Sequence, residues 1–285
     1  MIRKILLSLL VAACGVVAQP AQAAEWSDNA IRYWVGTSFK EPGVGANGTD
    51  GTDIAKNVFS FTHASGYKYG GNFLNVDVLL SSSVDNANNS NAGAAEIYAV
   101  YRTDLSFNRI SGSKMFSFGP VRDVLLIAGA DLSAKNTAFA AHVMKPVAGL
   151  ALSFDVPGFL NIGALAEKEW NNNGLVGKGV EFDATLLLTA AWGIPLGTPA
   201  LEFEGFANVI LPKGNDGFGN PTKTEVLLHP KLMGDVGALW GNPKSGFKLG
   251  VGFEYWLNKF GNDKNNPFAP GSEAKTPFLE AQVHL

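Results

Sequence analysis

The amino-acid sequence predicts an all-β fold, a transmembrane antiparallel β-barrel of about 12 strands, from three observations. Only 16% of the 285 residues are charged, below the quarter typical of soluble domains, while 46% are hydrophobic. No stretch beyond the N-terminal leader approaches the roughly 20 apolar residues that a membrane-spanning helix needs. Apolar and polar residues instead alternate over segments of about ten residues, which is typical of strands with lipid outside and a lumen inside.

The first 23 residues have the organisation of a secretory signal peptide. Arg3 and Lys4 form a short basic region, residues 5–17 form an apolar stretch, and small residues follow at Ala21 and Ala23. We therefore expect a signal peptide over 1–23 and one barrel domain over 24–285. Without Arg3 and Lys4 the 22 basic residues become about 20 against 25 acidic ones, a net charge of about −5.

Cys14 leaves two interpretations of this leader open. It is the only cysteine, so its removal with the signal peptide excludes disulfides and cysteine-based metal sites from the mature chain. The preceding residues 11–13 also resemble a lipoprotein cleavage site, which would place a lipid anchor on Cys14. That alternative leaves an apolar stretch of only about nine residues, shorter than signal peptides usually have.

The period-2 alternation is clearest between residues 180 and 211. Apolar residues from Val180 to Trp192 oppose Glu181 and Asp183, and the following segment repeats the pattern against Glu202 and Glu204. A helical period of 3.6 would mix the two sets, so these segments are predicted strands. The predicted strands are 29–40, 56–65, 74–80, 94–106, 117–132, 138–155, 159–169, 180–192, 201–211, 223–240, 247–258 and 278–285.

The last strand and the connections add further support. The final strand alternates up to the apolar Leu285, which resembles the terminal strand of bacterial outer-membrane barrels, although that class usually ends in Phe or Trp. Short turns near 66–70, 156–158, 194–199 and 241–246 alternate with longer polar stretches near 41–55, 82–94, 212–222 and 260–276. We expect the long connections outside the cell and the short ones in the periplasm. Pro146 predicts an edge, a bulge or a break in its strand.

A secreted β-sandwich is the soluble alternative, because its strands also alternate. Three features favour a membrane barrel. The polar faces hold carboxylates in facing ranks instead of lysine-rich surfaces. The apolar faces are six or seven positions long, and aromatic residues such as Trp192, Trp240, Tyr255, Tyr33 and Tyr101 lie near their ends, as at membrane interfaces.

Several segments are similar to the nucleoside-specific channel-forming (Tsx-type) outer-membrane proteins. They are Leu105–Ser106 through Phe116–Pro120, the loop Glu169–Gly174, the strand from Glu202 to Asn208, and Phe253 to Trp256. The resemblance is spread over most of the mature chain and rests on pattern. It implies a monomeric twelve-stranded barrel with a narrow pore for nucleosides, but the aromatic pairs of that family's pore have no clear match here.

The polar faces of the strands are the candidate site. The predicted pore-lining residues are Asp77, Glu96, Tyr98, Arg102, Glu181, Asp183, Glu202, Glu204, Phe206, Glu225, Lys231, Glu254 and Trp256. Twelve strands enclose a bore between the side-chain-filled eight-stranded barrels and the sixteen-stranded water channels. We therefore expect passive, porin-like transport of a small polar solute such as a nucleoside across a Gram-negative outer membrane, with Glu202, Glu204, Arg102 and Lys231 forming a constriction. In the alternative interpretation these charges pair with each other and plug a non-conducting barrel.

Other functional classes have weaker support in the sequence. An outer-membrane hydrolase would need a histidine beside a serine on the lipid-facing side; only His63 and His142 could qualify, and neither has a distinctive serine context. We therefore expect no enzyme activity. No nucleotide-binding loop or His/Cys metal spacing is present, so no cofactor is expected. An acidic chain without a basic stripe argues against nucleic-acid partners, which leaves membrane lipid and a small solute.

Overall fold

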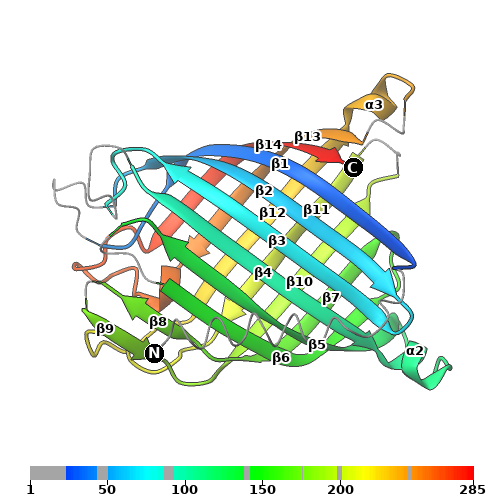
Figure 1. Cartoon of the computed structure of the whole chain (residues 1–285), viewed down its shortest axis with the longest axis horizontal. Coiled ribbons are helices and arrows are strands. Elements are labelled where there is room, and N and C mark those ends of the chain that lie inside the picture. Colours follow the sequence, from blue (N-terminus) through cyan, green and yellow to red (C-terminus); the bar gives the residue numbers. More distant parts are fainter. Residues whose placement is uncertain are drawn as a thin grey trace.

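A computed structural model describes residues 24–43, 51–86, 93–137, 142–174, 176–197, 201–242 and 246–285. The predicted signal peptide, with Cys14, lies outside the described residues, and so do parts of the predicted segments 41–55, 82–94, 138–155, 194–199 and 241–246. The described chain forms a closed antiparallel barrel with twelve wall strands, as the alternation predicts. Figure 1 shows the strands crossing the barrel obliquely around one lumen. No helix among the described residues is long and apolar enough to cross a membrane.

Each predicted strand corresponds to a strand in the wall. The wall strands are β1 (Trp26–Phe39), β2 (Ile54–Tyr67), β3 (Gly70–Ser81), β4 (Ala95–Ser106), β5 (Val121–Lys135), β6 (His142–Phe154), β7 (Phe159–Glu167), β10 (Thr185–Pro195), β11 (Leu201–Ile210), β12 (Glu225–Asp235), β13 (Phe247–Leu257) and β14 (Glu273–His284). The described residues also form three short helical segments, which are α2 (Phe107–Ser111), α3 (Val236–Leu239) and η2 (Lys259–Gly261).

Pairing between the first and last strands closes the barrel. In their register, Ala30 lies opposite His284 and Gly36 lies opposite Phe278. Closure leaves no strand edge among the wall strands, which is the condition for a sheet to cross a bilayer. The last residue, the short turns and the connections that contain α2 and α3 lie at one end of the barrel, and the other connections lie at the opposite end (Figure 1). We call these the turn end and the loop end.

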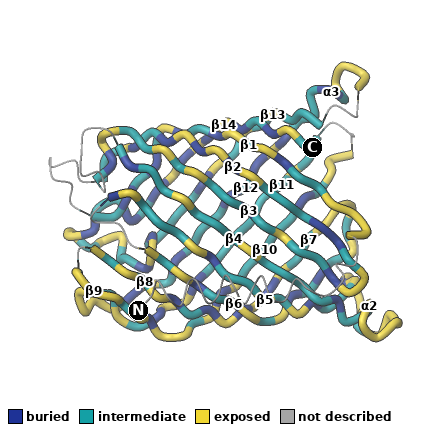
Figure 2. Tube along the Cα trace, viewed as in Figure 1, coloured by how far each residue is buried: buried dark blue, intermediate teal, exposed yellow. Residues whose placement is uncertain are grey.

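The two faces of the wall differ in polarity. Outward positions carry large apolar side chains with high exposure, such as Ile31 at 55%, Phe59 at 50%, Leu249 at 47% and Leu279 at 62%. Exposed and buried positions alternate along the tubes in Figure 2. Contact of this apolar surface with water would cost about 25 cal/mol per Å². An apolar surface of this extent on a closed sheet therefore indicates contact with hydrocarbon.

Two of the predicted strands extend beyond the corresponding wall strands of the structure. The segment 180–192 divides into β9 (Lys178–Glu181), which pairs with β8 (Trp170–Asn173), and the wall strand β10, which begins at Thr185. β8 also pairs with the start of β6, so this hairpin extends the loop end of the wall. Within the segment 223–240, the strand β12 ends at Asp235, and the side chain of Asp235 caps α3. The period-2 pattern continues through both breaks, so periodicity alone could not detect them.

β6 runs through Pro146 without an edge, bulge or break in the strand, but one of its two partner strands changes at this residue. On one side of it β6 pairs with β7, from Val147 opposite Glu167, and on the other it pairs with β8, from Met144 opposite Trp170. Proline has no backbone N–H to give to a ladder, so a change of partner strand at this residue sacrifices no hydrogen bond.

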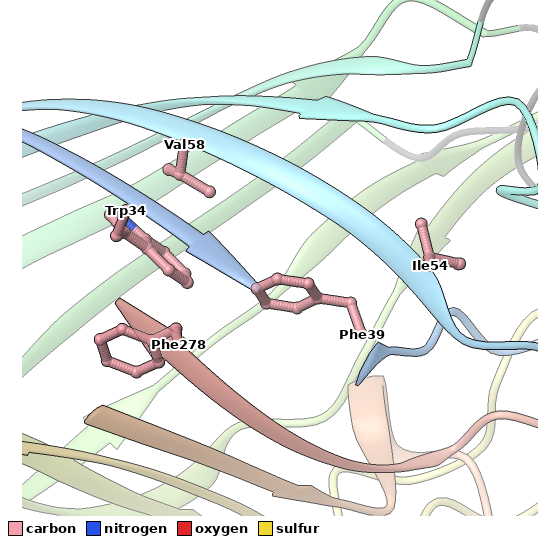
Figure 3. Close-up of a cluster of buried hydrophobic side chains, with 5 residues drawn as sticks. All are labelled: Trp34, Phe39, Ile54, Val58 and Phe278. Carbon is pink, nitrogen blue, oxygen red and sulfur yellow. The ribbon is translucent and has the colours of Figure 1, made fainter. Parts of the chain in front are cut away.

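A small apolar cluster lies inside the lumen. It consists of Trp34, Phe39, Ile54, Val58 and Phe278, all at most 5% exposed. Figure 3 shows these side chains directed toward one another from β1, β2 and β14. The lumen of this barrel is therefore partly filled by packed side chains.

Candidate functional site

All but two of the predicted pore-lining residues lie on the inward face of the wall. The inward residues are Asp77, Glu96, Tyr98, Arg102, Glu202, Glu204, Phe206, Glu225, Lys231, Glu254 and Trp256, which the register places opposite one another from strand to strand. Glu181 and Asp183 are the exceptions: both are exposed and lie before the start of β10. Glu181 pairs instead with Lys168 at 3.0 Å. The prediction that these two line the lumen is wrong, because it assumed one uninterrupted strand.

A chain of ion pairs follows the inward face across half of the wall strands. We call it the wall network, and its members are Arg32, Asp77, Glu202, Glu204, Lys231, Lys248 and Glu280. Its bonds run Asp77–Arg32 (3.6 Å), Arg32–Glu280 (3.3 Å), Glu280–Lys231 (2.8 Å), Lys231–Glu204 (3.3 Å), Glu204–Lys248 (3.2 Å) and Lys248–Glu202 (2.6 Å). Four carboxylates thus oppose three cations, so the network carries one excess negative charge.

The wall network is partly open to solvent at one end. The side chain of Glu202 is 31% exposed and that of Lys248 is 18% exposed, whereas that of Glu280 is fully covered. Glu202 and Glu204 alternate along β11, and Lys248 bonds to both. The predicted constriction residues Glu202, Glu204 and Lys231 therefore do lie together.

Arg102, the fourth predicted constriction residue, belongs to a separate group on β4 and β5. Its guanidinium donates to Asp131 at 2.5 Å, and the hydroxyl of Tyr98 donates to the other oxygen of the same carboxylate at 3.0 Å. Arg102 and Asp131 lie in the inward rows of neighbouring strands, which accounts for their pairing. Arg102 and Tyr98 thus form a separately bonded group on the lumen surface, directly beside the wall network, because Tyr98 is the register partner of Asp77.

A second set of charges meets at the loop end. Glu41, just beyond β1, accepts from Lys56 and lies 3.5 Å from Lys135 and 3.2 Å from Lys259. We call these four residues the mouth cluster. β1 and β5 are four places apart in the wall, roughly 19 Å along a sheet at about 4.8 Å per strand, so the Glu41–Lys135 contact crosses the interior. The mouth cluster therefore narrows the lumen at the loop end.

Electrostatics keep Glu41 charged although it is buried. Burial by itself would raise the pKa of the carboxyl, but Lys135, Lys259 and Lys56 together hold the pKa of Glu41 well below its usual range. The segment is also fixed through its backbone, because the amide of Asn86 donates to the carbonyl oxygens of Glu41 and Gly43 at 3.0 and 2.9 Å.

A similar buried carboxylate closes the other side of the loop end. Glu169, between β7 and β8, accepts from Lys213 of the β11–β12 connection and lies 3.6 Å from Lys145 of β6. The ammonium of Lys213 also lies over the ring of Phe182, 4.6 Å from its centroid. Because unpaired buried charges are costly, these contacts fix the β8–β9 hairpin and the β11–β12 connection to the wall.

Aromatic rings form a stack across the inward face between the wall network and the mouth cluster. The ring of His229 stacks on Phe206 at 5.1 Å and on Phe278 at 4.5 Å, and Phe278 lies 5.1 Å from Trp34. Gly252 of β13 makes this arrangement possible, because a Cβ there would lie 2.1 Å from the Phe278 ring. Trp34 and Phe278 are buried, whereas Phe206 is half-buried and presents part of its surface to the lumen.

Some members of the site were outside the predicted set. Arg32, Lys56 and Lys145 lie on the inward rows of their strands, so the period-2 signal contained them once each strand's phase was known. Glu41 and Lys213 lie in connections, where no periodicity exists to place a side chain. Among the described residues there is no group of three histidine, cysteine or acidic side chains suited to a metal ion.

A closed sheet with an apolar outside and charged inside surface decides the class of protein. The chain is an outer-membrane β-barrel. No family model matches the chain, and no curated protein matches it.

Solved outer-membrane barrels resemble the chain in architecture. The translocator domain of the autotransporter NalP from Neisseria meningitidis is 11% identical with a TM-score of 0.44, covering 99% of this chain and 95% of that one. An outer-membrane channel from Pseudomonas putida F1 is 9% identical with a TM-score of 0.46, covering 94% and 100%. The KdgM porin, solved with a disordered oligogalacturonate, is 8% identical with a TM-score of 0.41, covering 90% and 98%.

Proposed function

We propose that the barrel is a narrow channel for passive diffusion of a small polar solute across the outer membrane. The observation that carries this proposal is the wall network, an inward row of charges of both signs whose Glu202 and Lys248 remain partly exposed. Groups of this kind can exchange hydrogen bonds with a passing solute, because their desolvation is incomplete. The mouth cluster at the loop end, which we place outside the cell, limits the size of that solute.

The finer proposal is that the solute carries a planar ring as well as hydroxyl groups, as a nucleoside does. Phe206 supports it, because its half-buried ring lies on the same inward row of β11 as Glu202 and Glu204. An aromatic face can stack with a base, while carboxylates accept hydrogen bonds from sugar hydroxyls. The resemblance to the nucleoside-specific channel proteins points in the same direction.

Liposome swelling tests both levels of the proposal. Proteoliposomes containing the mature chain are mixed with isosmotic ribose, adenosine, uridine, a neutral amino acid and a trisaccharide, and protein-free liposomes provide the baseline. A passive channel gives swelling with the small solutes and little with the trisaccharide. Absence of swelling above baseline with every solute would reject the channel and favour a plugged, structural barrel.

The substitution Phe206→Ala separates the nucleoside proposal from the general one. Loss of one stacking contact, about 1–3 kcal/mol for a base, should slow nucleoside-driven swelling while ribose-driven swelling stays unchanged or increases. Phe203→Ala on the outward face of the same strand is the matched control and should alter neither rate. Equal changes for nucleosides and ribose in the Phe206→Ala channel would remove the support for a planar-ring solute.

A further inference from the structure

Three polar side chains form a hydrogen-bonded row on the outward face of β1 and β2. His63 Nδ1 lies 2.8 Å from Oδ1 of Asn29, and His63 Nε2 lies 3.1 Å from Oγ of Ser65. His63 and Ser65 are two residues apart on β2, and Asn29 is the register partner of His63 on β1. Both residues lie in the predicted strand 56–65, where a two-residue spacing already places them on one face, whereas the position of Asn29 beside His63 depends on the register of β1 with β2.

The bond to Asn29 sets the chemical state of the histidine ring. An amide oxygen can only accept, so Nδ1 of His63 donates to Asn29 and carries the ring proton in the neutral form. Nε2 then has the free lone pair and faces the hydroxyl of Ser65, which donates to it. This order of nucleophile, base and orienting group is the arrangement that activates a serine.

The row lies beside exposed apolar side chains of the outward face. Directly next to it along the two strands, Ile31 pairs with Phe61, and both are outward and exposed, at 55% and 40%. β1 begins and β2 ends at the turn end, so the row stands at the edge of the apolar surface. An ionisable side chain such as His63 on a lipid-facing row is a candidate functional residue, and Asn29 and Ser65 are its partners.

From this geometry we infer that the outward face carries a second activity, hydrolysis of ester-linked membrane lipids, with Ser65 as nucleophile, His63 as general base and Asn29 as positioning residue. An acyl chain lying along Ile31 and Phe61 brings its ester group to the row. Only 7% of the Ser65 surface is exposed, whereas His63 is half-buried. The ester therefore approaches the Ser65 hydroxyl from the side on which His63 lies. The activity is independent of solute passage, because the row and the lumen lie on opposite faces of the wall.

The reaction needs no reactant other than the lipid ester and water. Ser65 Oγ bonds to the carbonyl carbon while its proton moves to His63 Nε2; the ester C–O bond then breaks, and the leaving alcohol takes that proton. Water next attacks the acyl-serine, gives a proton to Nε2, and the bond to Oγ breaks with return of the proton to Ser65. The products are a fatty acid and the lysolipid.

Two measurements on the full mature barrel test the inference. The first follows oleate release from dioleoylphosphatidylethanolamine in mixed detergent micelles; the second maps covalent labelling by a fluorophosphonate with mass spectrometry. We expect oleate release, a label on Ser65, and loss of about 10³-fold in rate for Ser65→Ala. Absence of release by the native barrel, or release that persists in Ser65→Ala, would overturn the inference.

Matched variants distinguish catalysis from a structural polar row. Ser27→Ala, at the exposed register partner of Ser65, should keep both release and labelling. Asn29→Ala should lower kcat roughly tenfold with little change in KM, and Asn29→Asp should restore it. Heat-modified electrophoretic mobility shows whether each variant is folded, and the labelling of native protein needs no variant. A native barrel that is folded but unlabelled at Ser65 would assign the row to structure alone.

Discussion

The mouth cluster and the wall network are built from the same kinds of charged side chain, but cations outnumber carboxylates in the mouth cluster and carboxylates outnumber cations in the wall network. In the mouth cluster one carboxylate, Glu41, is shared by three ammonium groups whose side chains are 3–11% exposed. In the wall network four carboxylates share three cations, and Glu202 keeps 31% of its side-chain surface. The comparison separates charges that fix connections from charges that can meet a solute, because exposure rather than charge determines which groups can exchange partners.

The largest effect should come from removing the shared carboxylate of the mouth cluster. Glu41→Gln leaves three buried lysines without their common partner, and breaking a buried ion pair costs about 3–5 kcal/mol. We expect a lower free energy of unfolding in urea, measured by tryptophan fluorescence in lipid, and a larger single-channel conductance as the loop end opens. The control is Glu25→Gln, because Glu25 forms an exposed pair with Arg109. Unchanged stability and conductance in Glu41→Gln would mean that the mouth cluster does not hold the loop end together.

A smaller loss should follow from filling the space that Gly252 leaves for the aromatic stack. Gly252→Ala forces the buried Phe278 ring to move from its place between Trp34 and His229. Overpacking of this kind costs about 1–3 kcal/mol in unfolding free energy. Gly179→Ala is the matched control, since a Cβ at Gly179 meets no atom within 4 Å. Equal unfolding midpoints for the two variants would contradict the tight packing of this stack.

The same contrast explains what the sequence could predict. Period 2 identified every wall strand and put Lys231, Glu204 and nine other residues on the inward face, because each strand is a local, regular object. It could not place Glu41 or Lys213, whose positions depend on contacts between connections far apart in the chain. It also misplaced Glu181 and Asp183, since alternation continues through the β9–β10 break. The asparagine beside His63 likewise depends on the pairing register of β1 with β2.

Ion selectivity should respond moderately to charge removal in the wall network. Glu202→Gln with Glu204→Gln removes two carboxylates beside Lys248, so the lumen there becomes net positive. One unit charge at 4 Å in water is worth about 1 kcal/mol, which corresponds to roughly a fivefold shift of the permeability ratio toward anions. Reversal potentials in a potassium chloride gradient measure this shift. The control substitution Glu273→Gln, at a half-buried site on the outward row, should leave the ratio unchanged. Unaltered selectivity in the double variant would place the conduction path elsewhere.

The smallest expected effect is that of pH on the mouth cluster between pH 8 and pH 5. The pKa of Glu41 is depressed in the folded state, so its contribution to stability is complete above the unfolded value of about 4.3 and is lost only as pH falls through the lower folded value. The difference in unfolding free energy between the native chain and Glu41→Gln should therefore stay constant over this range and shrink only in stronger acid. Urea titrations of both proteins at pH 8, 6.5, 5 and 3.5 measure that difference. A difference that already declines between pH 8 and pH 5 would show that the three lysines do not hold the Glu41 carboxylate in its charged form.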